Sequence, residues 1–484
     1  MVFSSVIFLC IFLPVVLAGY YILPRKARGI WLLAASLGFY ICGGPKHLIY
    51  LIASIVFNYL AGIAIATFKD RRGQKAALVA AVIVNVGSLV YFKYTGLLVE
   101  TYNGLFAKSV EVPDIILPLG ISFYTFQCMS YIIDVYRAGA DGGTNTVVTK
   151  DPLKFALYIA MFPQLLQGPI IRFSEVKDSL DDPVVKADDF VKGIERFIVG
   201  LAKKAIIANT LGEVADKVFE IAPSDMSVSI AWLGAILYTL QILFDFAGYT
   251  DMAIGLGRMF GFKFAENFNY PYISRSITEF WRRWHITLGS WFRDYLYIPL
   301  GGNRKGNVYV NLLIVFLATG IWHGAAWGFL VWGLWHGLFM LIERALKGRK
   351  LPFALPAVIS NILKWGYTML AVTLGWVLFK IEDLAEALAY IKVMFGLDRH
   401  SYTAFSLRFF LDPRLVFFLM IAVIACVPWA QVLPRFFAAY IAEFSDSNKT
   451  APRIARHACL ILLLVISFIF IVNTTYSPFI YFQF

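Results

Sequence analysis

One histidine lies in an unusually apolar part of this sequence. His323 belongs to the triplet Trp322-His323-Gly324, inside a run from Asn307 to Ile342 that contains no Asp, Glu, Lys or Arg. An ionisable side chain at membrane depth costs free energy, so it is retained where it is hydrogen-bonded or functional. Burial favours the neutral imidazole, which is able to accept a proton or an acyl group. We therefore expect His323 to be catalytic; a structural histidine between two helices is the alternative.

Glycines on both sides of His323 predict close helix packing. They recur mostly at every fourth position, at residues 320, 324, 328, 333 and 337. This spacing leaves one face of each helix without side chains, so that two backbones can approach closely. The uncharged run is too long for one membrane span and predicts two short helices with a turn at Gly324–Gly328. His336 repeats the Trp-His-Gly context, and we expect it to have a packing role.

A second candidate histidine, His285, lies in the aromatic and basic segment from Phe280 to Gly306. Apolar side chains recur there every three or four residues, which predicts one amphipathic helix. The stripe consists of Phe280, Trp284, Leu288, Trp291, Phe292 and Tyr295. Such a helix is typical of a membrane interface, with its aromatic side chains at the level of the lipid headgroups. His285 is then either a second catalytic group that reaches the same cavity from the cytoplasmic face or an interfacial histidine.

Four cationic side chains in this segment are candidates for binding an anionic donor. Arg282 and Arg283 lie off the apolar stripe, and Arg304 and Lys305 form a basic turn. Guanidinium and ammonium groups bind phosphates through charge-assisted hydrogen bonds. We expect these cations to face a phosphate-bearing coenzyme, and a simple surface anchor is the alternative.

Two carboxylates, Asp245 and Asp251, occur in another long apolar stretch. Each should be paired or face a wet interior, and ion pairing with other segments is a more economical interpretation than catalysis. The five cysteines lack the C-x-x-C spacing of metal sites, and the sequence contains neither a metal-ligand cluster nor a Walker or G-x-S-x-G motif. We therefore expect no metal and no tightly bound cofactor.

The composition indicates an all-α polytopic membrane protein. Of the 484 residues, 59% are hydrophobic and only 15% are charged, which excludes an ordinary soluble domain. Apolar runs near bilayer length recur throughout and predict about eleven to thirteen spans. They lie at about 2–22, 30–43, 46–67, 76–98, 114–136, 152–171, 229–256, 307–325, 326–345, 357–379, 414–433 and 458–474. The chain is interpreted as a single membrane domain, residues 1–484.

The basic residues predict the orientation of these spans. Lys and Arg cluster in short loops, as at 25–28, 69–75 and 347–350, which places these loops in the cytoplasm and both termini outside. This topology accounts for the net charge of +12 without a nucleic-acid partner. Residues 161–172 mix Pro, Gln and Gly into an apolar run and are either a re-entrant segment or an interfacial loop.

Several motifs in the same order resemble the membrane-bound O-acyltransferase superfamily, and in particular its branch that acetylates bacterial polysaccharides such as alginate. The strongest resemblance covers about residues 240–340, and weaker motifs extend it over nearly the whole chain. The motifs are LPLGISFYTFQ (117–127), LFDFAGYTDMAIGLGRMFGF (243–262), NFNYPY (267–272), FWRRWHITLGSWFRDYLYIPLGGNRKG (280–306), GIWHGAAWGFLVWGLWHG (320–337) and NTTYSPFIYFQF (473–484).

The resemblance implies a ring of membrane helices, with re-entrant and interfacial helices, around a central tunnel that contains the family histidine at His323. It implies a second family histidine at His285. The motifs also contribute Gln127, Asn269 and Trp322, which we expect, with the two aspartates, to be tunnel-lining or structural polar residues.

The resemblance further implies an acyltransferase of the bacterial inner membrane. Acetyl from cytoplasmic acetyl-CoA would reach His323 and pass to a periplasmic SGNH-type acetyltransferase within a polysaccharide-synthesis machinery, which esterifies an exopolysaccharide such as alginate or cellulose. His323 would act as a general base or carry the acetyl group. Transfer of D-alanine or acetylation of peptidoglycan by the same fold is the first alternative. A proton-coupled transporter is a remote one, because the sequence shows no duplicated halves.

Overall fold

The computed structural model describes residues 2–139, 147–348, 356–397, 405–429, 450–474 and 476. Within these residues the regular structure is helical, and no β-strand occurs. The chain forms two compact units. Unit 1 comprises Met1–Phe197 and Thr250–Ala265, and unit 2 comprises Ile198–Tyr249 and Glu266–Phe484. The second half of the C-terminal motif, the end of the predicted span 414–433 and the end of the basic loop 347–350 lie outside the described residues.

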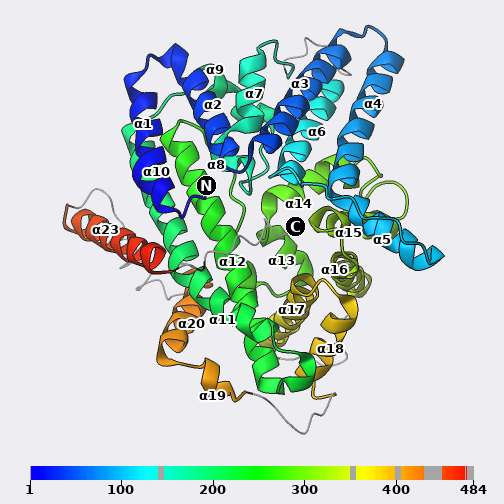
Figure 1. The fold of residues 1–484 in the computed structure, drawn as a ribbon, viewed down its shortest axis with the longest axis vertical. Helices are drawn as coiled ribbons and strands as arrows, with labels where there is room; N and C mark the ends of the chain where they lie inside the picture. Colours follow the sequence, from blue (N-terminus) through cyan, green and yellow to red (C-terminus); the bar gives the residue numbers. More distant parts are fainter. Residues whose placement is uncertain are drawn as a thin grey trace. The chain divides into compact units, whose positions relative to one another are not determined.

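Unit 1 is a set of apolar helices in which α3, α4 and α6 pack against one another (Figure 1). Its elements are the π-helix Phe8–Phe12, α1 (Leu13–Ile22), α2 (Arg25–Ile41), α3 (Pro45–Thr67), α4 (Arg71–Leu89), the π-helix Val90–Tyr94, α5 (Thr95–Phe106), α6 (Ile121–Ala138), α7 (Pro152–Ala160), α8 (Phe162–Leu165), α9 (Phe173–Asp181), most of α10 (Ala187–Ala202) and the end of α12 (Val228–Met259).

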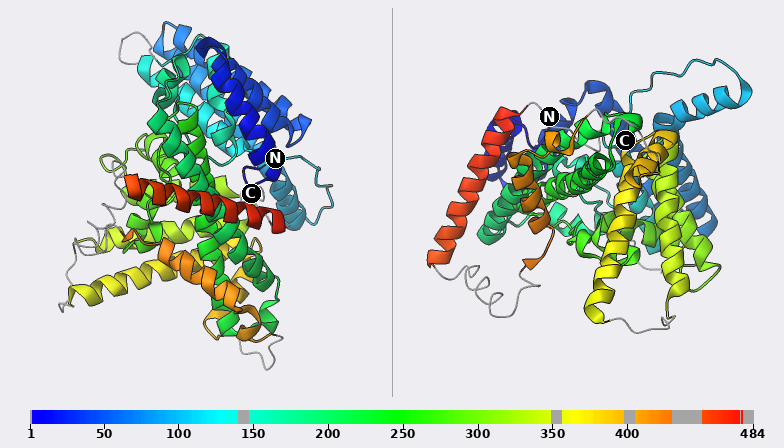
Figure 2. Two further views of the ribbon diagram at one scale, coloured as in Figure 1. Left: turned by 90° about the vertical axis from the view of Figure 1, so that its left-hand side faces the viewer. Right: turned by 90° about the horizontal axis from the view of Figure 1, so that it is seen from below.

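Unit 2 contains both candidate histidines. In it, α16 packs against both α15 and α17, and Figure 2 shows these helices from two further directions. Its elements after the start of α12 are α13 (Ile277–Arg283), α14 (Ile286–Phe292), the π-helix Arg293–Tyr297, α15 (Val308–His323), α16 (Trp327–Leu346), α17 (Ala357–Lys380), α18 (Leu384–Met394), α19 (Leu407–Phe410), α20 (Pro413–Ala425) and α23 (Thr450–Asn473). Before α12 it contains the π-helix Lys203–Ala208 and α11 (Asn209–Phe219).

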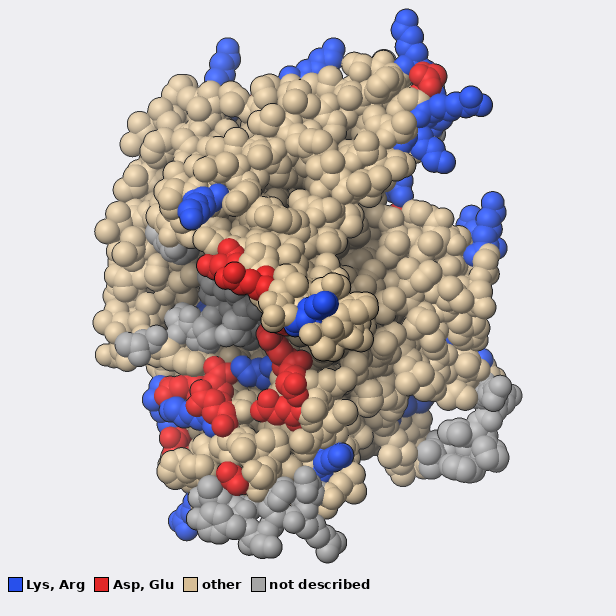
Figure 3. All heavy atoms as spheres, turned by 45° about the vertical axis from the view of Figure 1, so that its right-hand side comes forward, with Lys and Arg blue, Asp and Glu red and all other residues tan. Residues whose placement is uncertain are grey.

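Several helices are long and apolar enough to cross a membrane, as the composition predicts. Among the described residues six qualify, and three shorter apolar helices accompany them. The six are Pro45–Thr67, Arg71–Phe106, Val228–Met259, Trp327–Leu346, Ala357–Lys380 and Pro452–Asn473. Figure 3 shows a face of the molecule on which most of the surface carries no Lys, Arg, Asp or Glu. Apolar surface of this kind is stable against lipid, so the chain is a multi-pass membrane protein.

The predicted spans agree with the helices in most places, and residues 152–171 are the clear exception. That span is wrong, because α7 ends at Ala160 and is followed by the single turn α8. Residues 161–171 are nevertheless all buried. The Gln164 side chain donates to the Tyr158 carbonyl at 2.6 Å, and the Tyr158 hydroxyl donates to the Ile171 carbonyl at 2.8 Å. Irregular backbone that is buried and bonded in this way favours the re-entrant segment over the interfacial loop.

The single helix predicted within 280–306 is also wrong. The segment forms α13 and α14 with a break at Trp284 and His285, and a π-helix follows α14. The predicted apolar stripe is correct as a pattern of burial, since all six of its side chains are buried. They pack inside the protein. The 3.6-residue periodicity persists through the break because the two short helices continue the same buried face.

Glycines bring α15 and α16 into close contact, as their spacing predicts. A Cβ atom at Gly333 would lie 2.5 Å from the Phe316 carbonyl oxygen and 3.1 Å from the Gly320 Cα atom. A Cβ atom at Gly320 would lie 2.5 Å from the Phe329 carbonyl oxygen. Only glycine fits at these two positions, and the turn between the helices is therefore tight.

The two buried carboxylates of α12 are in ion pairs, which confirms the structural interpretation of both. In unit 2, Asp245 pairs with Lys204, and both side chains are buried. In unit 1, Asp251 accepts from the Arg196 guanidinium, with N···O distances of 2.6 and 2.8 Å. A buried charge is tolerated when it is paired in this way, because the partner offsets part of its desolvation.

We expect Gly333→Val to destabilise unit 2, because the added side chain would overlap the backbone of α15. Overpacking of a tight contact costs about 1–3 kcal/mol or more. The measurement is the midpoint of heat-induced unfolding in detergent. Gly87→Val is the matched control, since a Cβ atom at Gly87 meets nothing within 4 Å. Equal midpoints for the two variants would show that the close contact does not matter.

We expect Asp245→Asn to destabilise the protein by about 3–5 kcal/mol, because it removes the negative charge that compensates a buried ammonium group. Asp188→Asn is the control, since Asp188 forms an exposed pair with Lys192 at 2.6 Å. Exposed pairs contribute about 0–1 kcal/mol. Denaturant unfolding of both variants checks the difference, and similar losses would contradict this account of the buried pair.

Candidate functional site

His323 lies at the tight junction between α15 and α16. It is the last residue of α15, and the extended backbone of Gly324 (φ −162°) ends the helix directly after it. Its side chain is 4% exposed. Its ring contacts the rings of Trp332 and Phe379 edge-on, with centroids 4.9 and 5.2 Å away. The crowded position predicted for His323 is thus confirmed, and its catalytic role stays a prediction.

His285 lies at the break between α13 and α14, in a conformation that is rare for a residue with a side chain. Its backbone is left-handed (φ 44°, ψ 54°), which costs about 1–3 kcal/mol and requires surrounding contacts to hold it. The side chain is 1% exposed, and its ring packs edge-on against Phe246 with centroids 4.7 Å apart. His285 lies outside the candidate membrane spans, and burial lowers its pKa to about 3. The imidazole is therefore neutral at physiological pH.

Asn267 holds the break at His285 in place. It is fully buried and precedes the break in an extended segment. Its side-chain oxygen lies 3.1 Å from His285 Nδ1 and accepts from the backbone N–H and the hydroxyl of Thr287 at 3.2 and 2.9 Å. Its backbone carbonyl accepts from the Ile286 N–H at 2.9 Å. One asparagine thus binds three consecutive residues.

Asn269 lies in the same motif as Asn267 and is exposed. Its backbone pairs with Arg283: its carbonyl accepts from the guanidinium at 3.1 Å, and its N–H donates to the Arg283 carbonyl at 2.9 Å. Its role as a tunnel-lining or structural polar residue stays a prediction. Asn267 belonged to the same motif, but the sequence carried no signal for which of the two side chains is buried.

Trp322 links the two histidines. Its indole lies 4.8 Å from the His323 ring and 6.2 Å from the His285 ring, measured between centroids. The indole is 7% exposed. The two imidazoles therefore have one aromatic neighbour in common. The structure thus brings three of the predicted residues together.

A large cavity in unit 2 has a strongly basic lining. Its volume is about 1130 Å³. Six cationic side chains and a single carboxylate, Glu343, line it, and α13, α14 and α15 to α17 contribute the walls. The cations are Arg275, Arg282, Arg293, Arg344, Lys347 and Lys364. The remaining lining is mainly apolar, and on α15 it extends to Thr319, which is one helical turn before His323.

The Glu343 carboxylate binds the start of α13. Its carboxylate accepts from the backbone N–H groups of Ile277 and Thr278 at 2.5 and 2.9 Å, and from the Thr278 hydroxyl at 2.6 Å. These donors are at the start of the helix, where N–H groups lack intrahelical partners and a carboxylate is favourable. The single acidic side chain of the cavity lining is therefore partly neutralised, and the cations dominate its field.

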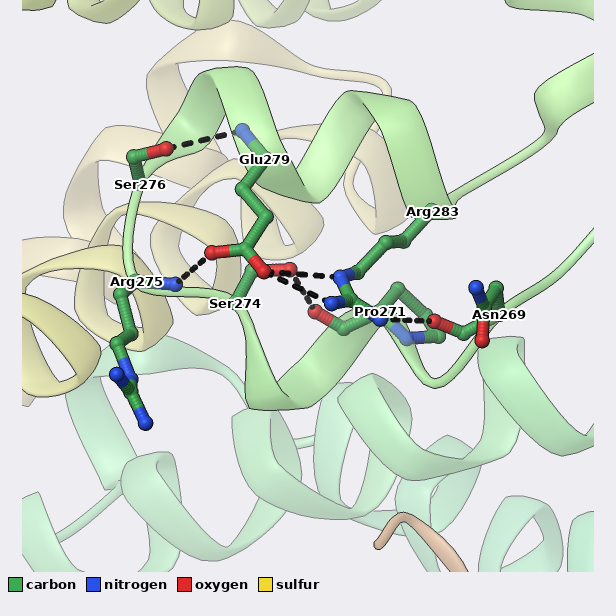
Figure 4. Close-up of polar contacts among 7 residues, drawn as sticks. All are labelled: Asn269, Pro271, Ser274, Arg275, Ser276, Glu279 and Arg283. Carbon is green, nitrogen blue, oxygen red and sulfur yellow. Dashed lines mark hydrogen bonds and ion pairs between the residues drawn. The ribbon is translucent and has the colours of Figure 1, made fainter. Parts of the chain in front are cut away.

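The arginines predicted to bind a donor separate into two groups. Arg282 lines the cavity. Arg283 does not, because it pairs with Glu279 at 3.0 Å and donates to the Asn269 carbonyl (Figure 4). The same Glu279 carboxylate accepts from the Arg275 backbone N–H at 2.9 Å, while the Arg275 guanidinium points away from it (Figure 4). Arg275, which the sequence did not single out, thus joins Arg282 in the cavity wall.

Arg304 and Lys305 lie in the predicted turn, where both side chains are exposed. Neither contributes to the cavity lining. The turn is held by Gly301, whose backbone is left-handed (φ 111°) and where a Cβ atom would lie 2.3 Å from the Lys305 carbonyl oxygen. Their contact with a donor stays a prediction.

Two further polar residues, Gln127 and His336, are buried in the protein. Gln127 lies in unit 1, on α6, and is 2% exposed, with its backbone carbonyl 3.3 Å from the Tyr158 hydroxyl. His336 is fully buried in unit 2, between Trp281 and Trp332, with both ring centroids at 5.2 Å. A Cβ atom at Gly375 would lie 2.7 Å from its Nε2 atom, so His336 fills a space that a glycine leaves. This packing agrees with the role predicted for His336.

Comparisons with known proteins show the family of this chain. The model of the membrane-bound O-acyltransferase family matches residues 102–379. A probable alginate O-acetylase, AlgI of Azotobacter vinelandii, is 39% identical over 514 residues, which cover 100% of both chains. The peptidoglycan O-acetyltransferase of Helicobacter pylori is 36% identical over 523 residues, 100% of this chain and 98% of that one.

A less similar relative is named for the transfer of a different acyl group, D-alanine. The teichoic acid D-alanyltransferase of Bacillus subtilis is 33% identical over 225 residues, 43% of this chain and 54% of that one. The family model includes both histidines, Asn267 and the residues that line the basic cavity. The chain belongs to the membrane-bound O-acyltransferase family and is an O-acyltransferase of the membrane.

Proposed function

We propose that this protein takes acetyl groups from cytoplasmic acetyl-CoA and passes them across the bacterial inner membrane for the O-acetylation of an exopolysaccharide. The final ester is made by a periplasmic SGNH-type acetyltransferase. The observation that carries the proposal is the basic cavity of unit 2, whose lining extends toward His323.

The chemistry of the cavity lining matches that of coenzyme A. The coenzyme carries several phosphate charges at one end and an uncharged, flexible arm that ends in the thioester at the other. Phosphates are bound well by convergent guanidinium and ammonium groups, and six such groups line the cavity. A volume of about 1130 Å³ exceeds that of most drug-sized ligand pockets and is ample for a molecule of this size.

The apolar part of the lining fits the uncharged arm. On α15 the lining residues are Leu312, Val315, Phe316 and Thr319, which recur every three or four residues and form one face of the helix. His323 follows Thr319 by four residues and so lies on nearly the same face. An arm that follows this face directs its thioester toward His323.

His323 supplies the group at which the acetyl is transferred. In one route its nitrogen attacks the thioester carbon, the C–S bond breaks, and the acetyl group rests on the imidazole before it passes to an acceptor hydroxyl. In the other route His323 removes the proton of the acceptor hydroxyl, which attacks the thioester directly. Acid-quenched protein carries labelled acetyl in the first route and none in the second.

The curated relatives support the acceptor class. Full-length similarity to alginate O-acetylases favours an exopolysaccharide, and a comparable full-length similarity favours peptidoglycan as the second candidate. Both acceptors present hydroxyls outside the inner membrane, so the donor half of the reaction is common to the two. The D-alanyl relative matches less than half of the chain, which makes that acyl group the least favoured of the three.

The orientation follows from the positive charges. Lys347, which lines the cavity, belongs to a loop that the distribution of Lys and Arg assigns to the cytoplasm. A cavity that opens there receives acetyl-CoA from the compartment in which it is made. The N-terminus and the C-terminus are then periplasmic.

We expect His323→Ala to abolish transfer. Reconstituted protein is given radiolabelled acetyl-CoA, and release of CoA and labelled acceptor are measured. A proton-transfer group contributes about 10²- to 10⁴-fold to rate, so CoA release should fall by at least about 100-fold. His47→Ala is the control, because His47 lies in unit 1 and accepts from the Leu119 N–H. Equal release by wild type and His323→Ala would refute the catalytic role.

We expect Arg282→Gln to raise the KM for acetyl-CoA about tenfold, which corresponds to the loss of one charge-assisted hydrogen bond of about 1.5 kcal/mol. The value of kcat should change little, because the phosphates are far from the reacting carbon. Lys108→Gln is the control, since Lys108 is exposed and lies in unit 1. An unchanged KM in Arg282→Gln, or an equal rise in the control, would count against the cavity as the donor site.

A further inference from the structure

We infer that Asn267 is a positioning residue which fixes His285 as the proton acceptor of the transfer step. The inference rests on the proposed function for the reaction, and on the bonds around His285 for the geometry. Asn267 begins the NFNYPY motif (267–272), but the sequence alone indicates no role for it. Its side chain is fully buried, and its carbonyl oxygen touches both His285 and Thr287.

The orientation of the Asn267 amide is determined by its neighbours. The backbone N–H of Thr287 is a donor, and the Asn267 side-chain atom that it meets at 3.2 Å must therefore be the oxygen. A flipped amide would bring its NH₂ group against this N–H, which is a contact between two donors. The side-chain oxygen, an acceptor without a hydrogen, thus faces the imidazole of His285.

This orientation selects the tautomer of His285. Its Nδ1 atom lies 3.1 Å from an oxygen that only accepts, so Nδ1 carries the hydrogen and donates it. In the neutral ring the other nitrogen, Nε2, then has the lone pair. The Ile286 backbone N–H donates to the Asn267 carbonyl at 2.9 Å, which holds the strained backbone of the neighbouring His285 in place. Asn267 thus determines both where the imidazole lies and which nitrogen is basic.

A basic Nε2 has a defined task in acyl transfer. In the route in which His323 carries the acetyl group, the acceptor oxygen forms a bond with the acetyl carbon, while the bond from this carbon to the leaving atom, a ring nitrogen of His323, breaks. The proton of the acceptor hydroxyl passes to His285 Nε2 and then to the leaving atom. The leaving atom thus receives the proton that the hydroxyl loses, and no further reactant is needed. Both imidazoles contact the Trp322 indole, with ring centroids 6.2 Å away for His285 and 4.8 Å away for His323.

The surroundings of His285 contain few groups that perturb its titration. Burial is the cause of its lowered pKa. On α12, the ionisable residue next to the contacting Phe246 is Asp245, which pairs with Lys204. On α15 it is His323, adjacent to the contacting Trp322.

The remaining charges belong to the segments on either side of His285. Arg283 of α13 pairs with Glu279, and Arg282 faces the cavity. Glu266, which precedes Asn267, is exposed. A negative charge introduced at position 267 would therefore be the largest new influence on the imidazole.

The decisive variant is Asn267→Asp. A carboxylate of the same shape still accepts from Thr287 and from His285 Nδ1, so the local geometry is kept, but its charge stabilises the imidazolium and raises the pKa of His285 toward its ordinary value near 6.5. A protonated base is inactive. We expect CoA release, relative to wild type, to be about tenfold lower at pH ~5.5 than at pH ~8.

Asn269→Asp is the matched control, since the same chemical change two residues away involves an exposed side chain. Its activity relative to wild type should not depend on pH. A pH-independent loss in Asn267→Asp would mean that Asn267 is merely structural and would overturn the inference. An Asn267→Asp profile that superimposes on that of Asn269→Asp would overturn it too.

A second measurement does not depend on activity. In full-length protein with ¹⁵N-labelled histidine, the resonances lost in His285→Gln identify its ring nitrogens, whose shifts report which one is protonated. The hydrogen is expected on Nδ1 near neutral pH, and a hydrogen on Nε2 would refute the inference. Failure of wild type to release CoA from acetyl-CoA would instead refute the proposed function, so the two outcomes are distinguishable.

Discussion

The apolar interior of this protein imposes one requirement on every polar group in it: a buried charge must be paired, or the group must be neutral. Asp245 meets the requirement with Lys204, whereas His285 meets it by losing its proton. A neutral imidazole is useful to catalysis only if the correct nitrogen is basic. This depends on a hydrogen-bond acceptor at the other nitrogen, which Asn267 provides. The electrostatic cost of burial thus explains both the ion pairs and the form of the candidate site.

Backbone contact places the second histidine. Because Gly320 and Gly333 bring α15 and α16 together, the chain must turn sharply after His323, and the ring is enclosed by aromatic side chains of α16 and α17. Aromatic walls exclude water. On the proposed function, they would protect a reactive acyl group held there from hydrolysis before it reaches an acceptor.

Sequence periodicity and charge predicted the features that follow from the types and spacing of residues along the chain. These include the long apolar helices, the close helix pair at the glycines, the burial of the aromatic stripe and the ion pairing of Asp245 and Asp251. Predictions from the sequence failed where tertiary contacts override the local pattern of residues. The break at His285 requires a left-handed residue that periodicity cannot reveal, and Asn267 and Asn269 differ in burial, which a motif does not specify. The pairing of Arg283 with Glu279, outside the cavity lining, could not be seen from charge alone.

The positions of the cationic and apolar side chains along the basic cavity also constrain how a donor would enter it. Moving the phosphates of acetyl-CoA into the apolar interior would cost several kcal/mol per charge. The phosphates are more stable beside the cations near Lys347 and Arg282 than they would be deeper in the protein. The uncharged arm has no such cost. On the proposed function, the coenzyme therefore enters arm first and stops when its phosphates meet these cations. The acetyl group alone continues, so the barrier to crossing the membrane is that of a small neutral group, and the transfer needs no movement of the coenzyme itself.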